Sequence, residues 1–467
     1  MVNLNWQKYP VYKSSGVEWL GDIPEHWEVK RLKFYFQSGK LGIKISPFGS
    51  YIKSDIIKSS NEIKSTERYK VYGQENVIGN SFKKGDKYIN VENFNRLSAY
   101  QIYPGNLVIT MMGTTGRCMV VPLEIEPGIM DSHLIRISVN ENEIKPTFLA
   151  LLINDSFYIY AQVKINSKGS IMEGLNSSII KYLLIAKPPL SEQQAIANFL
   201  DDKLAQIDEH IAKKQLMIQQ LKEQKTVIIN QAVTKGIKLD VPMKYSGVEW
   251  LGEIPEHWEV KRLKYVFHIQ TGVTLGKSYV NQVLETRPYL RVANVQDGYI
   301  DISDIKTIEL PNNEISRYVL QKGDVLMTEG GDFDKLGRGY IWKGQIKGCL
   351  HQNHIFAVRP IYKYLNSNFI AAFISSKKCK NYFIFTAKQT TNLASTNSTH
   401  LKNLKLLLPP LNEQQEIVSF IEKKSEKIGR SLTVIEKEIK LIQEYRTTLI
   451  SETVTGKIDV RKYHPPQ

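Results

Sequence analysis

The chain has 467 residues, of which 42% are apolar and 23% charged, and its formal net charge is +15. This length exceeds what one hydrophobic core usually organises, so two or more domains are expected, and the composition excludes a generally disordered chain. The positive balance favours a polyanionic partner, nucleic acid first and an acidic membrane surface second, although many basic proteins bind no DNA.

The start of the chain and its cysteines indicate the compartment. Residues 1–16 lack the apolar run of a signal peptide, and apolar stretches such as 404–411 are too short to span a bilayer. The three cysteines, Cys118, Cys349 and Cys379, form no CxxC pair, which fits a reducing compartment better than a disulfide framework. We therefore expect a soluble, cytoplasmic protein that does not contact a membrane.

From residue 15 the chain carries a stretch that it later repeats almost unchanged. Residues 15–33 read SGVEWLGDIPEHWEVKRLK, and residues 246–264 differ from them at one position. A second pair, PPLSEQQAIANFLDDK at 188–203 and PPLNEQQEIVSFIEKK at 409–424, recurs at an offset of 221 residues in place of 231. The chain therefore consists of two similar halves, and the second intervening segment is ten residues shorter than the first.

The two segments between these repeats, residues 34–187 and 265–408, have a different texture. Each is rich in β-branched residues, tyrosine and glycine, with short alternating runs such as NLVITMMG at 106–113 and YLRVANV at 289–295. Such runs predict short strands with glycine turns, and therefore an α+β domain in each segment.

Both segments also keep one order of features: a strand, a glycine-rich loop with an arginine, and a strand opened by a histidine. In the first segment the loop is GTTGR at 113–117, followed by SHLIRIS at 132–138. In the second it is LGRGY at 336–340, followed by NHIFAVR at 353–359. The ends of each half are thus nearly copied, while the middles share a skeleton and differ in their side chains.

A long helix is predicted after each PPL-EQQ motif. Ser191 with Gln194, and their counterparts Asn412 with Gln415, fit capping boxes, and a glycine follows near the end of each predicted helix. Apolar residues then recur at alternating spacings of four and three, the pattern of a coiled-coil seam, so we expect the helices to pair. The alternative is two ordinary amphipathic helices buried in separate domains. The seam positions are Leu200, Leu204, Ile207, Ile211, Lys214, Ile218, Leu221, Lys225, Ile228 and Ala232, and then Ile421, Ser425, Ile428, Leu432, Ile435, Ile439, Ile442, Arg446, Leu449 and Thr453.

No complete catalytic signature is present in the sequence. GVTLGKS at 272–278 has three residues before GK where a phosphate-binding loop needs four, and no HExxH, GxSxG or Cys/His metal cluster occurs. The proline pairs lack the polar-Pro-Pro-aromatic form that an amino-methylating enzyme needs. His26 and His257 each stand beside one carboxylate in PEHW, an incomplete metal or acid–base site, so packed or surface histidines are favoured. We expect no catalytic residue and no metal site.

The remaining candidate residues are ones that could bind DNA. Arg117 and Arg338 lie in the glycine-rich loops, where a guanidinium fork could reach guanine O6/N7 or a phosphate. Amide side chains in both segments could read adenine, while His133 and His354 open equivalent strands and could contact DNA or cap a turn. The predicted DNA-binding residues are Gln74, Thr114, Arg117, His133, Arg291, Asn294, Arg338, Gln352, Asn353 and His354.

The copied stretch has a structural interpretation. It opens each variable segment, where it could orient that segment on the helices. KIDV at 457–460 also copies KLDV at 238–241, which precedes the second SGVEWLG, so the chain end is predicted to return toward its own start. The residues interpreted as packing anchors are Trp19, Trp27, Trp250 and Trp258.

Taken together, these motifs resemble the specificity subunit of Type I restriction–modification systems. The resemblance rests on GVEWLG-IPEHWEVKRLK, the PPL-EQQ helix starts, YGQENVIG at 72–79 and PYLRVANVQDG at 288–298, and it covers essentially the whole chain. It implies an α+β fold in which two target recognition domains are separated by two long antiparallel helices, a coiled-coil spacer, in a circular pseudo-two-fold arrangement. The implied parts are a first recognition domain (1–187), a first helix (188–243), a second recognition domain (244–408) and a second helix with the tail (409–467).

The resemblance also implies a function. Each recognition domain would read one half of a bipartite site in double-stranded DNA, and two adenine methyltransferase subunits would dock on equivalent surfaces, joined by restriction subunits. This chain would be non-catalytic and bind no cofactor, while its partners would use S-adenosylmethionine, ATP and Mg²⁺. Two rival hypotheses are a self-contained DNA-modifying enzyme and a coiled-coil scaffold that binds no DNA.

Overall fold

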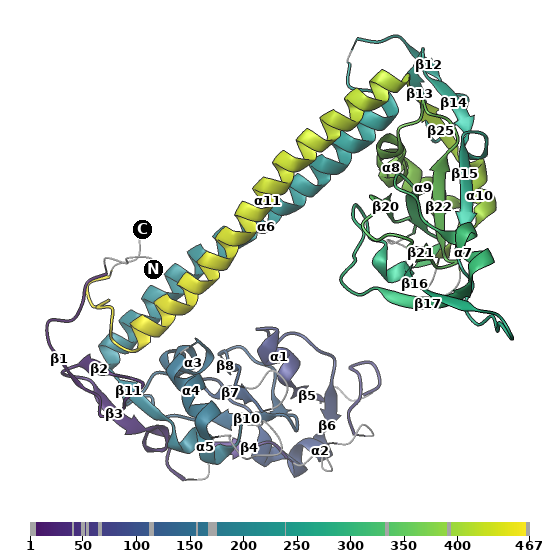
Figure 1. Cartoon of the computed structure of the whole chain (residues 1–467). Coiled ribbons are helices and arrows are strands. Elements are labelled where there is room, and N and C mark those ends of the chain that lie inside the picture. The colour runs from purple at the N-terminus through teal and green to yellow at the C-terminus, as the bar shows by residue number, and fades with distance from the viewer. Residues whose placement is uncertain are drawn as a thin grey trace. The chain divides into compact units, whose positions relative to one another are not determined.

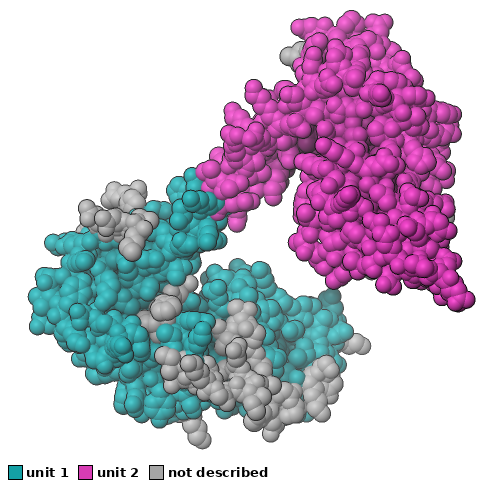
Figure 2. Space-filling view, in the orientation of Figure 1, with its two compact units in different colours: residues 1–214, 437–467 teal, residues 215–436 magenta. Residues whose placement is uncertain are grey.

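The computed structural model describes most of the chain. The described residues are 6–39, 42–47, 52, 56–63, 68–111, 116–155, 157–166, 175–238, 240–331, 336–389 and 394–463. They form two compact units: the first unit holds residues 1–214 and 437–467, and the second holds residues 215–436 (Figure 2). The predicted domain boundaries stay a prediction, because contacts assign part of each long helix to each unit.

Two long helices contribute to both units. α6 (Leu190–Lys235) has 46 residues and α11 (Leu411–Val454) has 44, which confirms the predicted helices. Gly236 directly follows α6 with a φ of +78°, a left-handed conformation that glycine adopts without strain at a helix end. Figure 1 shows α6 and α11 side by side with opposite directions. The start of α6 and the end of α11 therefore belong to the first unit, and the opposite ends belong to the second.

The predicted capping boxes are wrong. α6 begins at Leu190, so Ser191 lies inside its first turn, and the Gln194 amide donates to Asn198 Oδ1 at 2.9 Å instead of reaching back. α11 likewise begins at Leu411, before Asn412. The proline before each helix accepts a hydrogen bond from the first turn: Pro189 O accepts the N–H of Gln193 at 2.9 Å, and Pro410 O that of Gln414 at 3.0 Å.

Except for Lys225, the predicted seam positions are buried or partly buried in both helices. Leu200, Leu204 and Ile207 share a core with Leu449 in the first unit, and Ala232 shares one with Ile421 in the second. Burial at spacings of four and three follows from the apolar stripe that each sequence carries.

The polar residues of the seam find partners across the helix pair. Lys214 Nζ lies 2.6 Å from Glu438 Oε2, and Arg446 Nε lies 3.5 Å from Asp208 Oδ1. Lys225 is exposed, so the stripe is interrupted there.

Each copied stretch contributes one strand to a hairpin and one strand to a two-stranded ribbon. The hairpins are β1 (Tyr12–Ser14) with β2 (Asp22–Pro24), and β12 (Met243–Tyr245) with β13 (Glu253–Pro255). The ribbons, all antiparallel, are β3 (Glu28–Arg31) with β11 (Leu184–Lys187), and β14 (Glu259–Arg262) with β25 (Lys405–Leu408). In each unit, the strand that enters the variable segment is thus hydrogen-bonded to the strand that leaves it.

The variable segments share one sheet topology. In both units a four-stranded antiparallel sheet stands beside a three-stranded sheet that contains one parallel pair. In the first unit the strand orders are β4 (Ile43–Ile45), β10 (Leu134–Ile137), β7 (Leu107–Thr110), β8 (Cys118–Val120), and β6 (Tyr88–Asn90), β5 (Arg68–Tyr72), β9 (Gly128–Met130). In the second they are β15 (Phe267–Thr271), β22 (Ile355–Pro360), β18 (Val325–Thr328), β20 (Gly339–Ile341), and β17 (Lys306–Pro311), β16 (Leu284–Leu290), β21 (Leu350–His351).

Short helices complete each segment, which confirms the α+β expectation. The first unit contains α1 (Gln74–Ile78), α2 (Val91–Arg96), α3 (Pro146–Asp155), α4 (Phe157–Asn166) and α5 (Ser177–Tyr182). The second contains α7 (Asn312–Tyr318), α8 (Ser367–Ser375), α9 (Lys377–Thr386) and α10 (Ser398–Asn403), with a small sheet of β19 (Gly330–Gly331), β24 (Ala394–Ser395) and β23 (Lys388–Gln389). The predicted strand at 289–295 is wrong beyond Leu290, where a turn of 3₁₀ helix replaces it.

The copied tryptophans differ in burial. Trp27 and Trp258 are fully buried in the cores of the two units, as predicted for packing anchors. Trp250 packs partly buried against the second core, whereas Trp19 is 36% exposed.

The chain end returns to the chain start within the first unit, as predicted. The N–H of Asp459 donates to Gln7 O at 2.7 Å, and the Arg461 guanidinium lies 4.9 Å from the centre of the Tyr9 ring. Ile458 and Val460 are each 2% exposed in the first core. Among the described residues, no helix combines the length and apolar character needed to cross a bilayer.

Candidate nucleic-acid interface

The copied motifs meet at a joint in each unit, formed by the PEHW stretch and the first turn of a long helix. In the first unit His26 Nε2 lies 2.8 Å from Glu192 Oε2, and Trp27 Nε1 donates to Glu192 Oε1 at 3.0 Å. In the second unit Glu413 accepts from Trp258 Nε1 at 3.1 Å and pairs with His257 at 2.7 Å. A buried carboxylate with such partners is a structural centre, because its charge is compensated by donors.

The glutamine after each of these glutamates holds the variable segment. Gln193 is fully buried, and its amide accepts from Lys145 N at 2.7 Å and donates to Glu143 O at 3.1 Å. Gln414 repeats this arrangement, accepting from Asn366 N at 2.9 Å and donating to Tyr364 O at 3.2 Å. The EQQ motif therefore fastens the copied stretch with its glutamate and the variable segment with its first glutamine.

No group of three or more His, Cys, Asp or Glu side chains in the described part of the chain could hold a metal ion. Tyr9 donates its hydroxyl hydrogen to the Glu192 carboxylate. Burial raises the pKa of Tyr9, and the Glu192 carboxylate raises it further, so Tyr9 stays neutral. The candidate interface is formed by other residues, at the ends of strands in the two larger sheets of each unit.

Three predicted residues of the first unit gather at one edge of its sheets, called here the first loop edge: Gln74, Arg117 and His133. Asp131 N donates to Tyr72 O at 2.8 Å, which joins the ends of the parallel strands β5 and β9. Gln74 begins α1 just after β5, and His133 precedes β10. Arg117 N donates to Thr110 Oγ1 at 3.0 Å, where β7 ends beside the start of β10.

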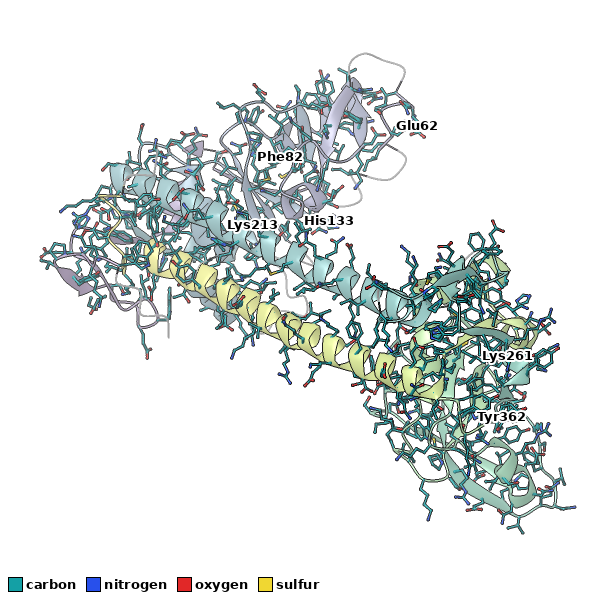
Figure 3. All side chains as sticks on the ribbon, turned by 90° about the horizontal axis from the view of Figure 1, so that it is seen from above. Glu62, Phe82, His133, Lys213, Lys261 and Tyr362 are labelled. Carbon is teal, nitrogen blue, oxygen red and sulfur yellow. The ribbon has the colours of Figure 1, made fainter. Side chains whose placement is uncertain are left out.

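The side chains of the first loop edge differ in their support. His133 is held by Asp131, whose Oδ2 lies 3.5 Å from Nδ1, and its side chain is 43% exposed (Figure 3). Burial raises the pKa of the Asp131 carboxyl, and His133 opposes that shift. Arg117 is exposed, and the buried Oε1 of Gln74 has no hydrogen-bond partner among the described residues. Thr114 lies outside the described residues.

The equivalent edge of the second unit, the second loop edge, holds Arg338, Gln352, Asn353 and His354. Arg338 follows Gly337, as Arg117 follows Gly116, and both glycines have positive φ, +70° and +83°. This conformation turns the chain into β20 or β8 with an arginine at the strand start. The equivalence that the sequence predicted for the two arginine loops is therefore confirmed.

Arg338 and His354 are both fixed by neighbours. Arg338 Nη1 donates to Gln296 Oε1 at 2.8 Å, and the Gln296 amide in turn donates to Ala293 O at 2.7 Å. His354 Nδ1 lies 2.7 Å from Glu329 Oε2 and its side chain is 55% exposed. Because the Glu329 carboxylate lies at Nδ1, a ligand would meet this histidine through Nε2.

Asn294 lies in the scaffold. It is 3% exposed, its Oδ1 accepts from Arg291 N at 2.8 Å, and its Nδ2 donates to Asp301 O and Asp304 O at 3.0 Å. Asn76 makes the same bonds in the first unit, beginning with Gly73 N at 2.9 Å. With its amide fully used, this side chain supports the turn after β16.

The remaining candidates of the second unit are divided between scaffold and surface. Gln352 Oε1 accepts from Val292 N at 3.3 Å, and the Arg291 guanidinium pairs with Asp304 Oδ2 at 2.7 Å. Asn353 is half-buried, and its N–H donates to Val273 O at 3.0 Å. Arg338 and His354 are thus the positions where the second loop edge matches the first.

Sequence reasoning missed the side chains that orient these groups. Asp131 stands two residues before His133, a spacing that could have suggested it. Gln296 and Glu329 reach their partners across 42 and 25 residues, so no local pattern identifies them.

The chain matches a family described as Type I restriction modification DNA specificity domain, over residues 46–220 and 255–441. Since these two matches cover well over half of its length, the chain belongs to that family, which confirms the resemblance noted above. The paired matches correspond to the two halves of the sequence.

Similar proteins support this assignment. The Type I restriction enzyme EcoKI specificity subunit of Escherichia coli is 28% identical over 283 residues, 59% of this chain and 57% of that protein. The chain spans about half of the length of the first curated relatives that it matches, 47% and 57%.

Solved structures support the fold. The HsdS subunit from Thermoanaerobacter tengcongensis covers 93% of this chain and 98% of its own, with a TM-score of 0.50 at 16% identity. A chain from a structure on complex assembly and conformational transition of the type I R-M system covers 92% and 98%, with a TM-score of 0.64 at 14% identity. Both likenesses concern the fold of mixed helix and sheet.

Proposed function

We propose that this chain is the non-catalytic DNA-recognition subunit of a Type I restriction–modification complex. Each loop edge reads one half of a bipartite site in double-stranded DNA. The observation that carries this proposal is the pair of loop edges: one topology places an arginine and a carboxylate-held histidine at equivalent strand ends, amid otherwise different side chains. A reader of two unlike half-sites needs such a common frame with different contacts.

The long helices act as a coiled-coil spacer between the two readers. The apolar stripe shared by α6 and α11, with ion pairs at its polar positions, supports this role. A helix rises about 1.5 Å per residue, so the helix length fixes the distance between half-sites.

Two adenine methyltransferase subunits dock on the copied surfaces, and restriction subunits join through them. The duplicated joint supports this proposal, because two identical partners need two matching surfaces. This chain binds no cofactor of its own, and its partners use S-adenosylmethionine, ATP and Mg²⁺. The complex acts in the cytoplasm.

Labelled S-adenosylmethionine tests the division of labour. We expect the pure chain to transfer no methyl group to DNA, and the chain with its methyltransferase partner to methylate adenines in one bipartite motif. Methylation or cleavage by the chain alone would establish the enzyme hypothesis instead.

Arginine variants test the reading edges in the complex. Arg117→Ala and Arg338→Ala should each relax the preference at a different half-site by about tenfold to a hundredfold, the ~1–3 kcal/mol of one bidentate base contact. Arg430→Ala, on the exposed face of α11, is the matched control and should change neither. Unchanged sequence preference in both loop variants would remove the arginines from the reading surface.

A further inference from the structure

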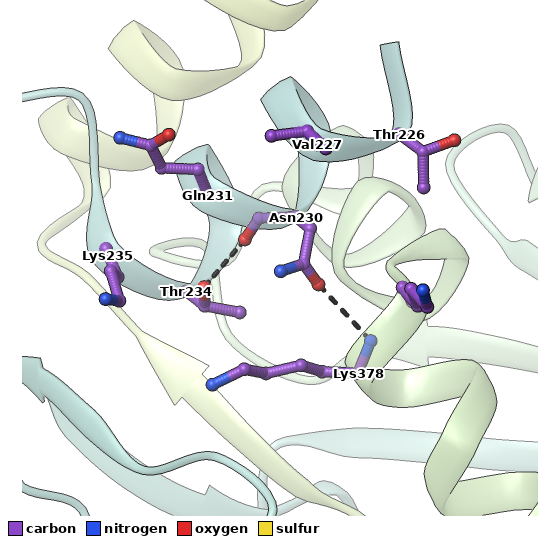
Figure 4. Close-up of a pocket in the computed structure, with 8 residues that line it drawn as sticks. Thr226, Val227, Asn230, Gln231, Thr234, Lys235 and Lys378 are labelled. Atoms are coloured by element: carbon purple, nitrogen blue, oxygen red, sulfur yellow. Dashed lines mark hydrogen bonds between the residues drawn. The ribbon is translucent and has the colours of Figure 1, made fainter. Parts of the chain in front are cut away.

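A hollow of about 360 Å³ opens in the second unit where α6 ends beside α9 (Figure 4). It lies in the described part of that unit, and none of the predicted DNA-binding residues lines it. Gly236, next to the lining residue Lys235, lies close to the joint glutamate Glu413. The lining residues are Thr226, Val227, Asn230, Gln231, Thr234, Lys235, Lys377 and Lys378. Three of the eight are lysines and none is acidic, so the hollow is basic.

Hydrogen bonds fix the walls of this hollow. Asn230 Oδ1 accepts from Lys378 N at 3.2 Å, which holds the first turn of α9 against α6 (Figure 4). Thr234 Oγ1 donates to Asn230 O at 2.7 Å, and Lys378 Nζ donates to Leu251 O. The lysines therefore stand on a built frame rather than on a loose surface.

No acidic side chain lines the hollow, so its own walls do not neutralise its positive charge. Among the described residues, neither Lys235 nor Lys377 forms an ion pair. Burial lowers the pKa of Lys378, and the nearby ammonium of Lys235 lowers it further. An anion placed between these groups would relieve their mutual repulsion.

The corresponding place in the first unit has lost this character. α11 carries Glu452 at the position where α6 carries Gln231, and α4 begins Phe-Tyr-Ile-Tyr where α9 begins Lys-Lys-Cys-Lys. There Lys457 is also affected by burial, which lowers its pKa, but Asp22 and Glu452 oppose that shift. The basic hollow is therefore a property of the second reader and not a requirement of the shared fold.

The hollow is linked to the second loop edge by α9. Lys380, one turn after Lys377 on the same helix face, pairs with Asp297. Asp297 is the neighbour of Gln296, whose amide holds Arg338. A strand of DNA that passes the Arg338 loop could thus continue along α9 toward the hollow.

We propose that the hollow binds a phosphate group of the DNA backbone, next to the half-site that the second loop edge reads. This inference rests on the proposed function and adds a contact that positions DNA without reading it. Lysine ammonium groups suit this role, because they act as point charges and have no fork for a base edge. The bound DNA would then be held more firmly at the second half-site than at the first.

The test uses the complex of this chain with its methyltransferase partner, and a double variant, Lys235→Gln with Lys377→Gln. Dissociation constants are measured over a series of salt concentrations, for a duplex with the methylated motif and for an unrelated duplex. We expect affinity to fall by the same factor for both duplexes. The slope of log K against log salt should become shallower by about 0.9, the change expected for one lost phosphate contact.

A matched control distinguishes the loss of the site from a general loss of positive charge. Lys423→Gln with Lys427→Gln removes two exposed charges from α11 that do not line the hollow. This control should leave the salt slope near its original value. Thermal unfolding shows that both double variants are folded.

Each outcome decides the proposal. If the complex recognises its motif and the Lys235/Lys377 variant keeps the original slope, the phosphate site is overturned while the proposed function stands. A loss confined to the motif duplex would make the lysines readers and overturn it as well. Saturable ATP binding that the double variant loses, with an unchanged DNA slope, would assign the hollow to a free nucleotide. If the unaltered complex shows no preference for any duplex, the proposed function itself fails.

Discussion

The two units have nearly identical contacts at their joints but different supporting residues at their loop edges. At the joints, Glu192 and Glu413 accept the same histidine and tryptophan donors with nearly the same distances. At the loop edges, each histidine has a carboxylate partner, but Asp131 follows β9 whereas Glu329 follows β18. A feature copied in sequence therefore serves the frame, while a feature preserved only in geometry belongs to the proposed reading surface.

The largest test of this comparison concerns the joints. Trp27→Ala and Trp258→Ala should each destabilise their own unit by ~3–5 kcal/mol, because each removes a fully buried side chain and leaves a cavity. The urea midpoint, followed by circular dichroism, measures the loss. Glu18→Ala, in the same copied stretch but exposed, should change little. A large loss in only one of the two variants would show that the joints are not equivalent.

A second test uses a difference between the sheets. His351, fully buried in β21, stands where the first unit has Met130, and burial lowers its pKa to about 4. As pH falls from about 6.5 to 4, the unfolded chain binds a proton that the folded chain excludes. The free energy of unfolding should therefore fall by up to about 3 kcal/mol over this range.

The matched variant for this test is His351→Met, which copies the residue of the first unit. Its unfolding free energy should lose less between pH 6.5 and 4 than that of the original chain, as measured by urea unfolding at each pH. Identical pH dependence in the two proteins would contradict the assignment to His351.

A third test separates orientation from contact at the second loop edge. Gln296→Leu removes the hydrogen bond to Arg338 and should weaken discrimination at that half-site by ~1 kcal/mol, less than Arg338→Ala. Methylation rates on duplexes with single base changes measure this effect. Discrimination at the other half-site serves as the internal control, and a loss there of equal size would contradict the prediction.

The smallest effect is expected between the helices. Lys214 and Glu438 are partly exposed, so their ion pair should contribute no more than about 1 kcal/mol. A double-mutant cycle with Lys214→Met and Glu438→Met measures the coupling from thermal unfolding. A much larger coupling energy would mean that this ion pair is less accessible to solvent than the exposure of its two side chains indicates.

Sequence reasoning succeeded where periodicity or repetition carries the signal. The stripe at spacings of four and three predicted both helices, and the repeats predicted the equivalence of the arginine loops. It failed at helix starts, because Ser191 and Asn412 satisfy the capping pattern although each helix already begins at the leucine before them. It could not find Gln296 or Glu329, because their contacts depend on tertiary packing. Asn294 matched a base-reading amide in residue type, but its burial was not visible in the sequence.

The antiparallel ribbons, β3 with β11 and β14 with β25, have a consequence for how such a protein can change. Each brings the two ends of a variable segment within one strand spacing, about 4.8 Å. The two segments therefore differ in length by ten residues without any effect on the positions of the helix residues that flank them. A segment exchanged at these strands, whatever its length, would leave the register of α6 and α11 unchanged, so specificity and assembly can evolve as separate modules.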